Sequence, residues 1–139
     1  MPANSAMRRC AVAALLLLVS AGTASATDCR PPLERWAQVE LYLGRNIAGV
    51  GEVSERQFRD FLADAVTPRF PDGLTVAGVD GQFRVGKRII RERSKLLILL
   101  VPAADDVTDK VAALVDAYKR RSRQQSVLHT ETTVCLAFD

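Results

Sequence analysis

The sequence predicts an α+β fold in which two helices cover one face of a four-stranded antiparallel sheet. Three observations support this prediction. Residues 96–101 form an unbroken apolar run that ends at Pro102, which is typical of a central strand buried on both faces. Two other segments carry apolar residues at the spacing of an amphipathic helix. Strand-like and helix-like segments follow one another as strand, helix, strand, strand, helix, strand.

The N-terminus has the pattern of a secretory signal peptide. Two arginines precede an apolar run at residues 10–19, and small residues end in an A-x-A motif at Ala26. This run is shorter than the roughly 20 residues that cross a bilayer. We therefore expect residues 1–26 to be removed, which leaves a single domain at residues 27–139. The alternative is an uncleaved helix that anchors the protein.

The charge of the mature chain is close to balanced. Residues 27–139 carry 17 basic and 16 acidic side chains. Nucleic-acid binding is not expected, because there is no large positive surplus to neutralise phosphates. We expect a periplasmic or secreted bacterial protein with no stable membrane span after cleavage.

Two cysteines remain after the signal peptide is removed. Cys29 lies near the mature N-terminus and Cys135 near the C-terminus. Exported proteins meet an oxidising compartment, where two cysteines usually pair. We expect a disulfide. A lipid-modified Cys29 and a pair of free thiols are the alternatives.

The first half of the domain begins with a strand at residues 36–45. Its odd positions are apolar and face the core, while Gln38, Glu40 and Tyr42 face the other side. Residues 44–51 contain three glycines and are expected to form a loop. A helix follows, capped by Ser54 and Gln57 and ended by Pro68. Its apolar stripe consists of Phe58, Phe61, Leu62, Ala65 and Val66.

The second half supplies three strands and a helix. We expect a strand at residues 74–79, a turn or bulge at Asp80-Gly81, and a second turn at Gly86-Lys87 that leads into a long strand at 88–101. Residues 82–85 could continue the first of these strands beyond Asp80-Gly81. The second helix should begin at Asp105-Asp106 or Thr108 and end at the basic residues 119–121, as the helix dipole favours. The last strand should cover residues 126–138.

This order of elements is the split βαβ, or ferredoxin-like, pattern (βαββαβ). Right-handed crossovers place the first and third strands at the centre and the fourth beside the first. The first and fourth strands then run antiparallel. The topology therefore brings Cys29 close to Cys135.

The sheet face away from the helices is the expected functional surface. It would carry Glu40 and Tyr42 beside an apolar row from residues 96–101. Soluble monomers seldom expose such a patch. We expect a homodimer through this face. The alternatives are a cavity for an apolar ligand, or cover from the long hairpin or the C-terminal tail.

Candidate ligand-binding residues are Glu40 and Tyr42 on this face, and Arg69 and Asp72 in a proline-rich loop. Arg69 and Asp72 could instead simply pair and stiffen that loop. The single histidine, His129, has no partner in sequence for catalysis or metal binding. We predict no catalytic residues, no metal site and no cofactor.

Five stretches resemble the signature segments of a bacterial family catalogued as domain of unknown function 3574. They are Glu40-Leu-Tyr-Leu-Gly-Arg, Gly51-Glu-Val-Ser, Thr67-Pro-Arg-Phe-Pro-Asp-Gly-Leu-Thr-Val, Arg91-Glu-Arg-Ser-Lys and Gln124-Gln-Ser-Val. The resemblance implies an exported or lipid-anchored protein with one small domain. It implies no activity, ligand or catalytic residue.

Two functions are consistent with these observations. The first is a non-catalytic, dimeric module of the cell envelope that binds a small molecule or a protein partner. The second is a small dimeric enzyme resembling the ferredoxin-like monooxygenases, with a cavity between sheet and helices. Its residues would be Glu40, Tyr42 and Arg69, with His129 as a further candidate. This comparison is an analogy of fold alone.

Overall fold

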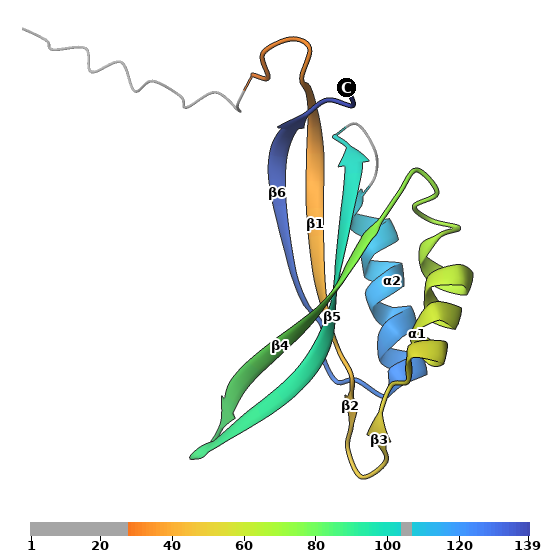
Figure 1. Cartoon of the computed structure of the whole chain (residues 1–139), viewed down its shortest axis with the longest axis vertical. Coiled ribbons are helices and arrows are strands. Elements are labelled where there is room, and N and C mark those ends of the chain that lie inside the picture. Colours follow the sequence, from red (N-terminus) through yellow and green to blue (C-terminus); the bar gives the residue numbers. More distant parts are fainter. Residues whose placement is uncertain (1–27, 104–106) are drawn as a thin grey trace, which may run out of the picture.

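The computed structural model describes residues 28–103 and 107–139. The predicted signal peptide and the predicted helix start at Asp105-Asp106 lie outside these ranges. The main strands form one antiparallel sheet in the order β4-β5-β1-β6, and the helices pack beside it (Figure 1). The elements are β1 (Glu34–Gly44), β2 (Asn46–Ile47), β3 (Gly51–Glu52), α1 (Glu55–Phe61), η1 (Leu62–Val66), β4 (Thr75–Val85), β5 (Arg88–Pro102), α2 (Val107–Ser122) and β6 (Leu128–Leu136).

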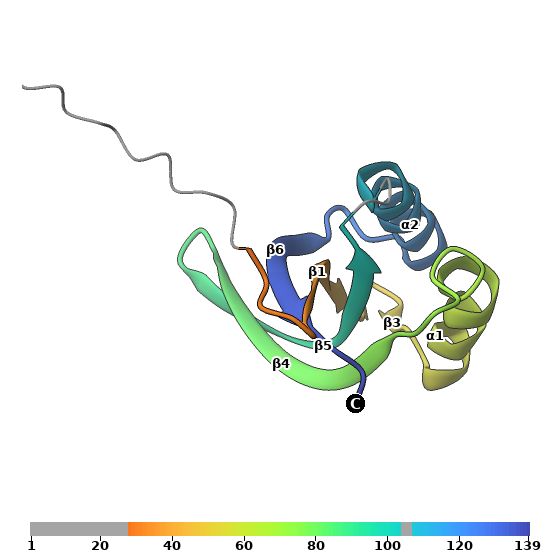
Figure 2. The same ribbon diagram turned by 90° about the horizontal axis from the view of Figure 1, so that it is seen from above.

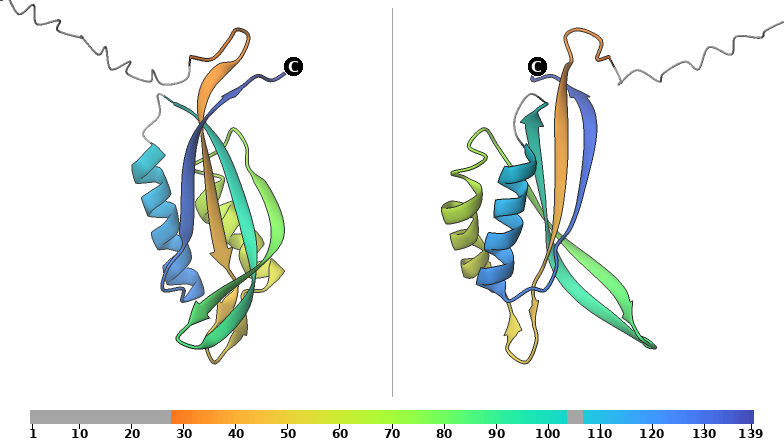
Figure 3. Two further views of the ribbon diagram at one scale, coloured as in Figure 1. Left: turned by 90° about the vertical axis from the view of Figure 1, so that its left-hand side faces the viewer. Right: turned by 180° about the vertical axis from the view of Figure 1, so that it is seen from behind.

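The strand order confirms the predicted ferredoxin-like architecture. β5 and β1 are the central strands, and β6 pairs with β1 in the antiparallel sense. Both helices lie on one side of the sheet, and the β4–β5 hairpin sweeps away on the other side (Figures 2 and 3). The predicted fold class is therefore correct, and one face of the sheet has no helix over it.

The core fills the space between the sheet and the helices. Its fully buried residues from the strands are Val39, Leu41, Leu43, Leu97 and Leu99. Phe61 of α1 packs edge-on against Tyr118 of α2, with ring centroids 5.0 Å apart. This contact joins the two helices above the central strands.

The apolar run at residues 96–101 is buried on only one face. Leu97, Leu99 and Val101 point toward the helices and are buried, whereas Leu100 is 37% exposed. The prediction of burial on both faces is wrong because successive strand residues point to opposite sides and helices cover only one of them. The run therefore supplies both the core and an uncovered surface.

The first helix begins as predicted and ends differently. Ser54 and Gln57 form a reciprocal capping box. Pro68 has no backbone N–H and cannot continue an α-helical pattern. After α1 the chain forms the short π-helix η1, in which the Thr67 amide donates to the Leu62 carbonyl at 2.9 Å. The sequence pattern predicted an α-helix throughout this stretch.

Two predicted irregular segments are regular in the structure. The glycine-rich stretch after β1 contains the short β2–β3 hairpin. β4 continues through Asp80 and Gly81, which pair in register with Arg93 and Glu92. The expected turn or bulge is absent there because β5 offers an unbroken partner along the whole length. A single long β4–β5 hairpin results.

A disulfide joins the two ends of the domain. Cys29 precedes β1 and Cys135 lies in β6, 106 positions later, with Cα atoms 5.5 Å apart. The link holds the edge strand β6 to the start of β1. In the part of the chain that is described, no helix has the length and apolar character to cross a membrane.

Candidate functional site

The uncovered side of the sheet, here called the open face, is defined by the strand register. Residues that pair between neighbouring strands point to the same side of the sheet. Every second residue of β1, together with its pairing partners in β5, β6 and β4, therefore lies on the open face. They are Glu34, Trp36, Gln38, Glu40 and Tyr42 of β1; Ser94, Leu96, Ile98, Leu100 and Pro102 of β5; Leu128, Thr130, Thr132, Val134 and Leu136 of β6; and Thr75, Ala77 and Val79 of β4.

Glu40 lies near the middle of the open face, on the central strand β1. Its Oε1 accepts a hydrogen bond from Gln38 Nε2 at 2.9 Å, and its Oε2 accepts one from the Tyr42 hydroxyl at 3.2 Å. The bond to Glu40 raises the pKa of Tyr42, because the neutral hydroxyl is the donor and the carboxylate is negatively charged. These contacts hold the carboxylate in place between the apolar Ile98 of β5 and the polar Thr130 of β6.

The C-terminal tail contacts one end of the open face. Phe138 packs edge-on against Trp36, with ring centroids 5.8 Å apart. Phe138 itself remains 80% exposed, and Leu100 and Leu128 are also exposed. The tail therefore does not cover the face as one of the sequence alternatives proposed.

Arg69 and Asp72 lie on a different part of the molecule from Glu40 and Tyr42. Arg69 Nη1 donates to the Ala65 carbonyl at 2.7 Å, at the end of the first helix. It also lines a surface hollow beside Arg120 and Arg121 of α2. Asp72 is exposed in the loop that leads into β4. The structure thus brings Glu40 and Tyr42 together, but it places Arg69 on the helix side of the sheet.

The enzyme alternative required a cavity between the sheet and the helices, but side chains fill this space. Tyr118 is fully buried there, and its hydroxyl donates to the Gly44 carbonyl at 2.8 Å. Burial raises the pKa of Tyr118 to about 12. Leu114 is also fully buried between sheet and helix. This packing serves stability and leaves Glu40 on the opposite side.

His129 is an exposed residue of the edge strand β6. Its Nε2 lies 3.8 Å from Glu131 Oε1, two positions along the same strand. Within residues 28–103 and 107–139, no group of three or more His, Cys, Asp or Glu side chains is arranged to hold a metal ion.

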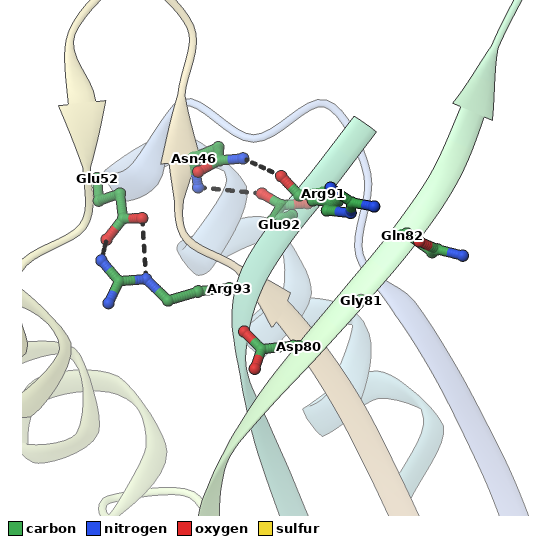
Figure 4. A pocket seen from close by; sticks show the side chains of 8 residues that line it. All are labelled: Asn46, Glu52, Asp80, Gly81, Gln82, Arg91, Glu92 and Arg93. Carbon is green, nitrogen blue, oxygen red and sulfur yellow. Dashed lines mark hydrogen bonds and ion pairs between the residues drawn. The ribbon is translucent and has the colours of Figure 1, made fainter. Parts of the chain in front are cut away.

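A polar hollow of about 380 Å³ lies where the β4–β5 hairpin leaves the sheet (Figure 4). Arg93 bonds both carboxylate oxygens of Glu52, at 3.2 and 2.6 Å, and this contact lowers the pKa of Glu52. The Asn46 amide donates to Glu92 Oε1 at 3.0 Å. The sequence did not indicate this cluster, because its hydrogen-bonded pairs, Glu52–Arg93 and Asn46–Glu92, are 41 and 46 positions apart and their residue types are ordinary for a surface.

The fold and this uncovered face define a ferredoxin-like α+β domain with an apolar sheet surface opposite its helices. The chain belongs to the family of proteins of unknown function DUF3574, whose model matches residues 38–138. This confirms the resemblance found in the sequence. No curated protein matches the chain significantly.

Solved structures share the fold at low sequence identity. Phage SAM lyase in complex with S-methyl-5'-thioadenosine has a TM-score of 0.57 and 15% identity, over 74% of this chain and 90% of that chain. A phage SAM lyase in the apo state has a TM-score of 0.52 and 16% identity, over 83% of this chain and 98% of that chain. CutA from Synechococcus elongatus gives 0.48 and 10%, over 72% and 77%. At these identities the first two show a common fold alone.

Proposed function

We propose that this protein is an exported, non-catalytic module of the bacterial cell envelope that works as a pair of copies joined through the open face. The observation that carries this proposal is the contrast between the two sides of one sheet. Helices bury one side, while the other side presents the row Leu96, Ile98 and Leu100 of β5 beside the hydrogen-bonded carboxylate of Glu40. An apolar surface of this kind is typical of an interface.

The disulfide supports the proposed location. A bond between Cys29 and Cys135 is expected to persist in an oxidising compartment such as the periplasm and to be rare in the cytosol. In the proposed module, Glu40 offers an acceptor for a hydrogen-bond donor or cation from a bound partner or small molecule. Its role is recognition, so no bond is made or broken there.

Native mass spectrometry of protein purified from its own periplasm tests this proposal. We expect a chain that lacks residues 1–26, carries the disulfide and has the mass of two copies. Ile98→Lys places a charge on the open face and should produce folded monomers. Ala112→Lys, at an exposed position of α2, is the matched control and should remain a dimer. A wild-type monomer, or a dimeric Ile98→Lys variant, would contradict the proposal.

Enzymatic activity is the second candidate function. The observation in its favour is the carboxylate of Glu40, which is held by two hydrogen bonds on a fold shared with phage SAM lyase. S-methyl-5'-thioadenosine, present in that structure, is therefore a suitable probe for calorimetry. Saturable binding that Glu40→Gln abolishes would favour the enzyme. No heat of binding is the result expected for the proposed module.

A further inference from the structure

The distal part of the β4–β5 hairpin extends beyond the rest of the sheet. β1 ends at Gly44, which pairs with Ser94, so no third strand of the sheet pairs with the two-stranded ribbon at residues 80–93, whose base contacts the body through Glu92 and Arg93. We call this ribbon the arm; Figures 1 and 3 show it projecting away from the body. Two-stranded ribbons are marginally stable in water, and they are usually stabilised by packing against something else.

The arm exposes large apolar side chains. Phe83, Val85 and Ile89 are 50%, 57% and 55% exposed. The register pairs Phe83 with Ile90 and Val85 with Arg88. These pairs lie on the side of β5 that also carries Leu96 and Ile98, because strand residues alternate with a period of two. One side of the arm therefore continues the open face.

The charges of the arm and the open face are opposite in sign. Residues 80–93 carry five basic and two acidic side chains, whereas the rest of residues 27–139 carries twelve basic and fourteen acidic ones. Both charged members of the open face, Glu34 and Glu40, are acidic.

On the side of the arm that carries Phe83, the charged side chains are Arg88 near the tip and Glu92 at the base, where Glu92 accepts a bond from the Asn46 amide. The other arginines, Arg84, Arg91 and Arg93, lie on the opposite side. The charge complementarity with the open face is therefore between Arg88 and the acidic Glu40.

The base of the arm is fixed to the body. The Glu52–Arg93 pair and the bond from the Asn46 amide to Glu92 tie it to the β2–β3 hairpin (Figure 4). A Cβ added to Gly44 would lie 2.6 Å from Glu92 Oε1, so this glycine leaves room for the carboxylate. A fixed base reduces the conformational entropy that the arm loses when it docks.

We infer that the arm of each copy lies across the open face of a second copy, with Arg88 at the partner subunit's Glu40 and Phe83 among its apolar residues. This inference rests on the proposed pairing through the open face, and it names the element and the ion pair that achieve it. A symmetric pair makes each contact twice. The same association then covers both surfaces that a single copy leaves exposed, which favours a second copy over an unrelated partner.

Charge reversal tests the inference. Glu40→Arg and Arg88→Glu should each weaken self-association at least about tenfold, because each places like charges together in both halves of the symmetric pair. An equimolar mixture of the two variants should restore association as mixed dimers, since each variant then supplies what the other lacks. Native mass spectrometry separates mixed from like dimers by mass, and sedimentation velocity gives the dissociation constants.

Two less disruptive substitutions keep the inference testable if the charge-reversal variants fail to fold. Phe83→Ser removes an apolar contact from the arm and should weaken the dimer, whereas Val50→Ser, at a 67% exposed position of the β2–β3 turn, should not. A wild-type dimer that neither charge reversal nor Phe83→Ser weakens would overturn the role of the arm and leave pairing through the open face intact. A wild-type monomer would overturn both.

Discussion

The two sides of β5 carry similar residues and differ in what covers them. Leu99 is fully buried beneath the helices, and its neighbour Leu100 is 37% exposed on the open face. The helices contribute Phe61, Leu114 and Tyr118 to the covered side. The comparison shows that one apolar strand can supply two surfaces, since one set of alternate residues stabilises the fold and the other set lies on a face that no helix covers.

Removing the disulfide should give the largest loss of stability. This loss does not depend on whether a side of the sheet is covered by helices or open. The bond lies at the strand ends and closes a loop of 106 positions. Replacing both cysteines by serine should lower the free energy of unfolding by about 4 kcal/mol in the chain-entropy model. Urea denaturation measures this loss, and wild-type protein with reductant is the control. A loss below about 1 kcal/mol would show that the bond contributes little.

Truncation of neighbouring leucines tests the comparison itself. Leu99→Ala should lower the free energy of unfolding by about 3 kcal/mol, because it leaves a cavity under the helices. Leu100→Ala should cost under about 1 kcal/mol when measured at a protein concentration that keeps the chain monomeric. Urea denaturation of both variants gives the values. Equal losses would mean that the open face is covered within a single chain.

Gly44 marks the junction between the body and the arm. An alanine there would place its Cβ against the Glu92 carboxylate, 2.6 Å from Oε1. Gly44→Ala should therefore displace Glu92 from the Asn46 amide and lower the free energy of unfolding by about 1–2 kcal/mol. Gly78→Ala in β4 is the matched control, since an added Cβ meets nothing within 4 Å there. Thermal unfolding of the two variants checks the difference.

Tyr118 on the covered side of the sheet and Tyr42 on the open face can be compared by their ionisation at high pH. We expect the smallest effect on stability here. The pKa of each is raised, that of Tyr118 to about 12 by burial and that of Tyr42 by its bond to Glu40. A raised pKa in the folded state means that the stabilisation is complete below pH 10 and is lost as the pH rises toward 12. Ultraviolet titration should show both groups ionising late.

Phenylalanine variants assign these two titrations. Tyr118→Phe should remove the step near pH 12, and Tyr42→Phe should leave it unchanged. Tyrosinate absorbance is the readout in both cases. A Tyr118 step that coincides with that of free tyrosine would contradict its burial beneath the helices.

Much of the fold could be predicted because local signals agree with the topology. The alternation in β1 identified a strand with one core face, and the Ser54–Gln57 capping box identified the start of α1. The strand order followed from the sequence of elements and the handedness of crossovers. The juxtaposition of Cys29 and Cys135 followed from that order.

Features that depend on distant partners could not be predicted. Asp80-Gly81 has the composition of a turn, yet pairing with Arg93 and Glu92 keeps it in a strand. The Glu52–Arg93 bond joins residues 41 positions apart, and no local pattern indicates it. On the open face, the sequence placed Glu40 and Tyr42 on one side correctly, but it could not show that Arg69 lies across the sheet from them.

The disulfide also determines how the protein responds to proteases. The tip of the arm, at Gly86 and Lys87, is exposed and contains a site for trypsin-like enzymes. A cut there divides the backbone, but both fragments contain one of the two linked cysteines, so they stay in one covalent molecule. β4 and β5 would still be aligned in the sheet after such a cut. A chain cut at this tip can thus remain a single covalent molecule with its sheet intact.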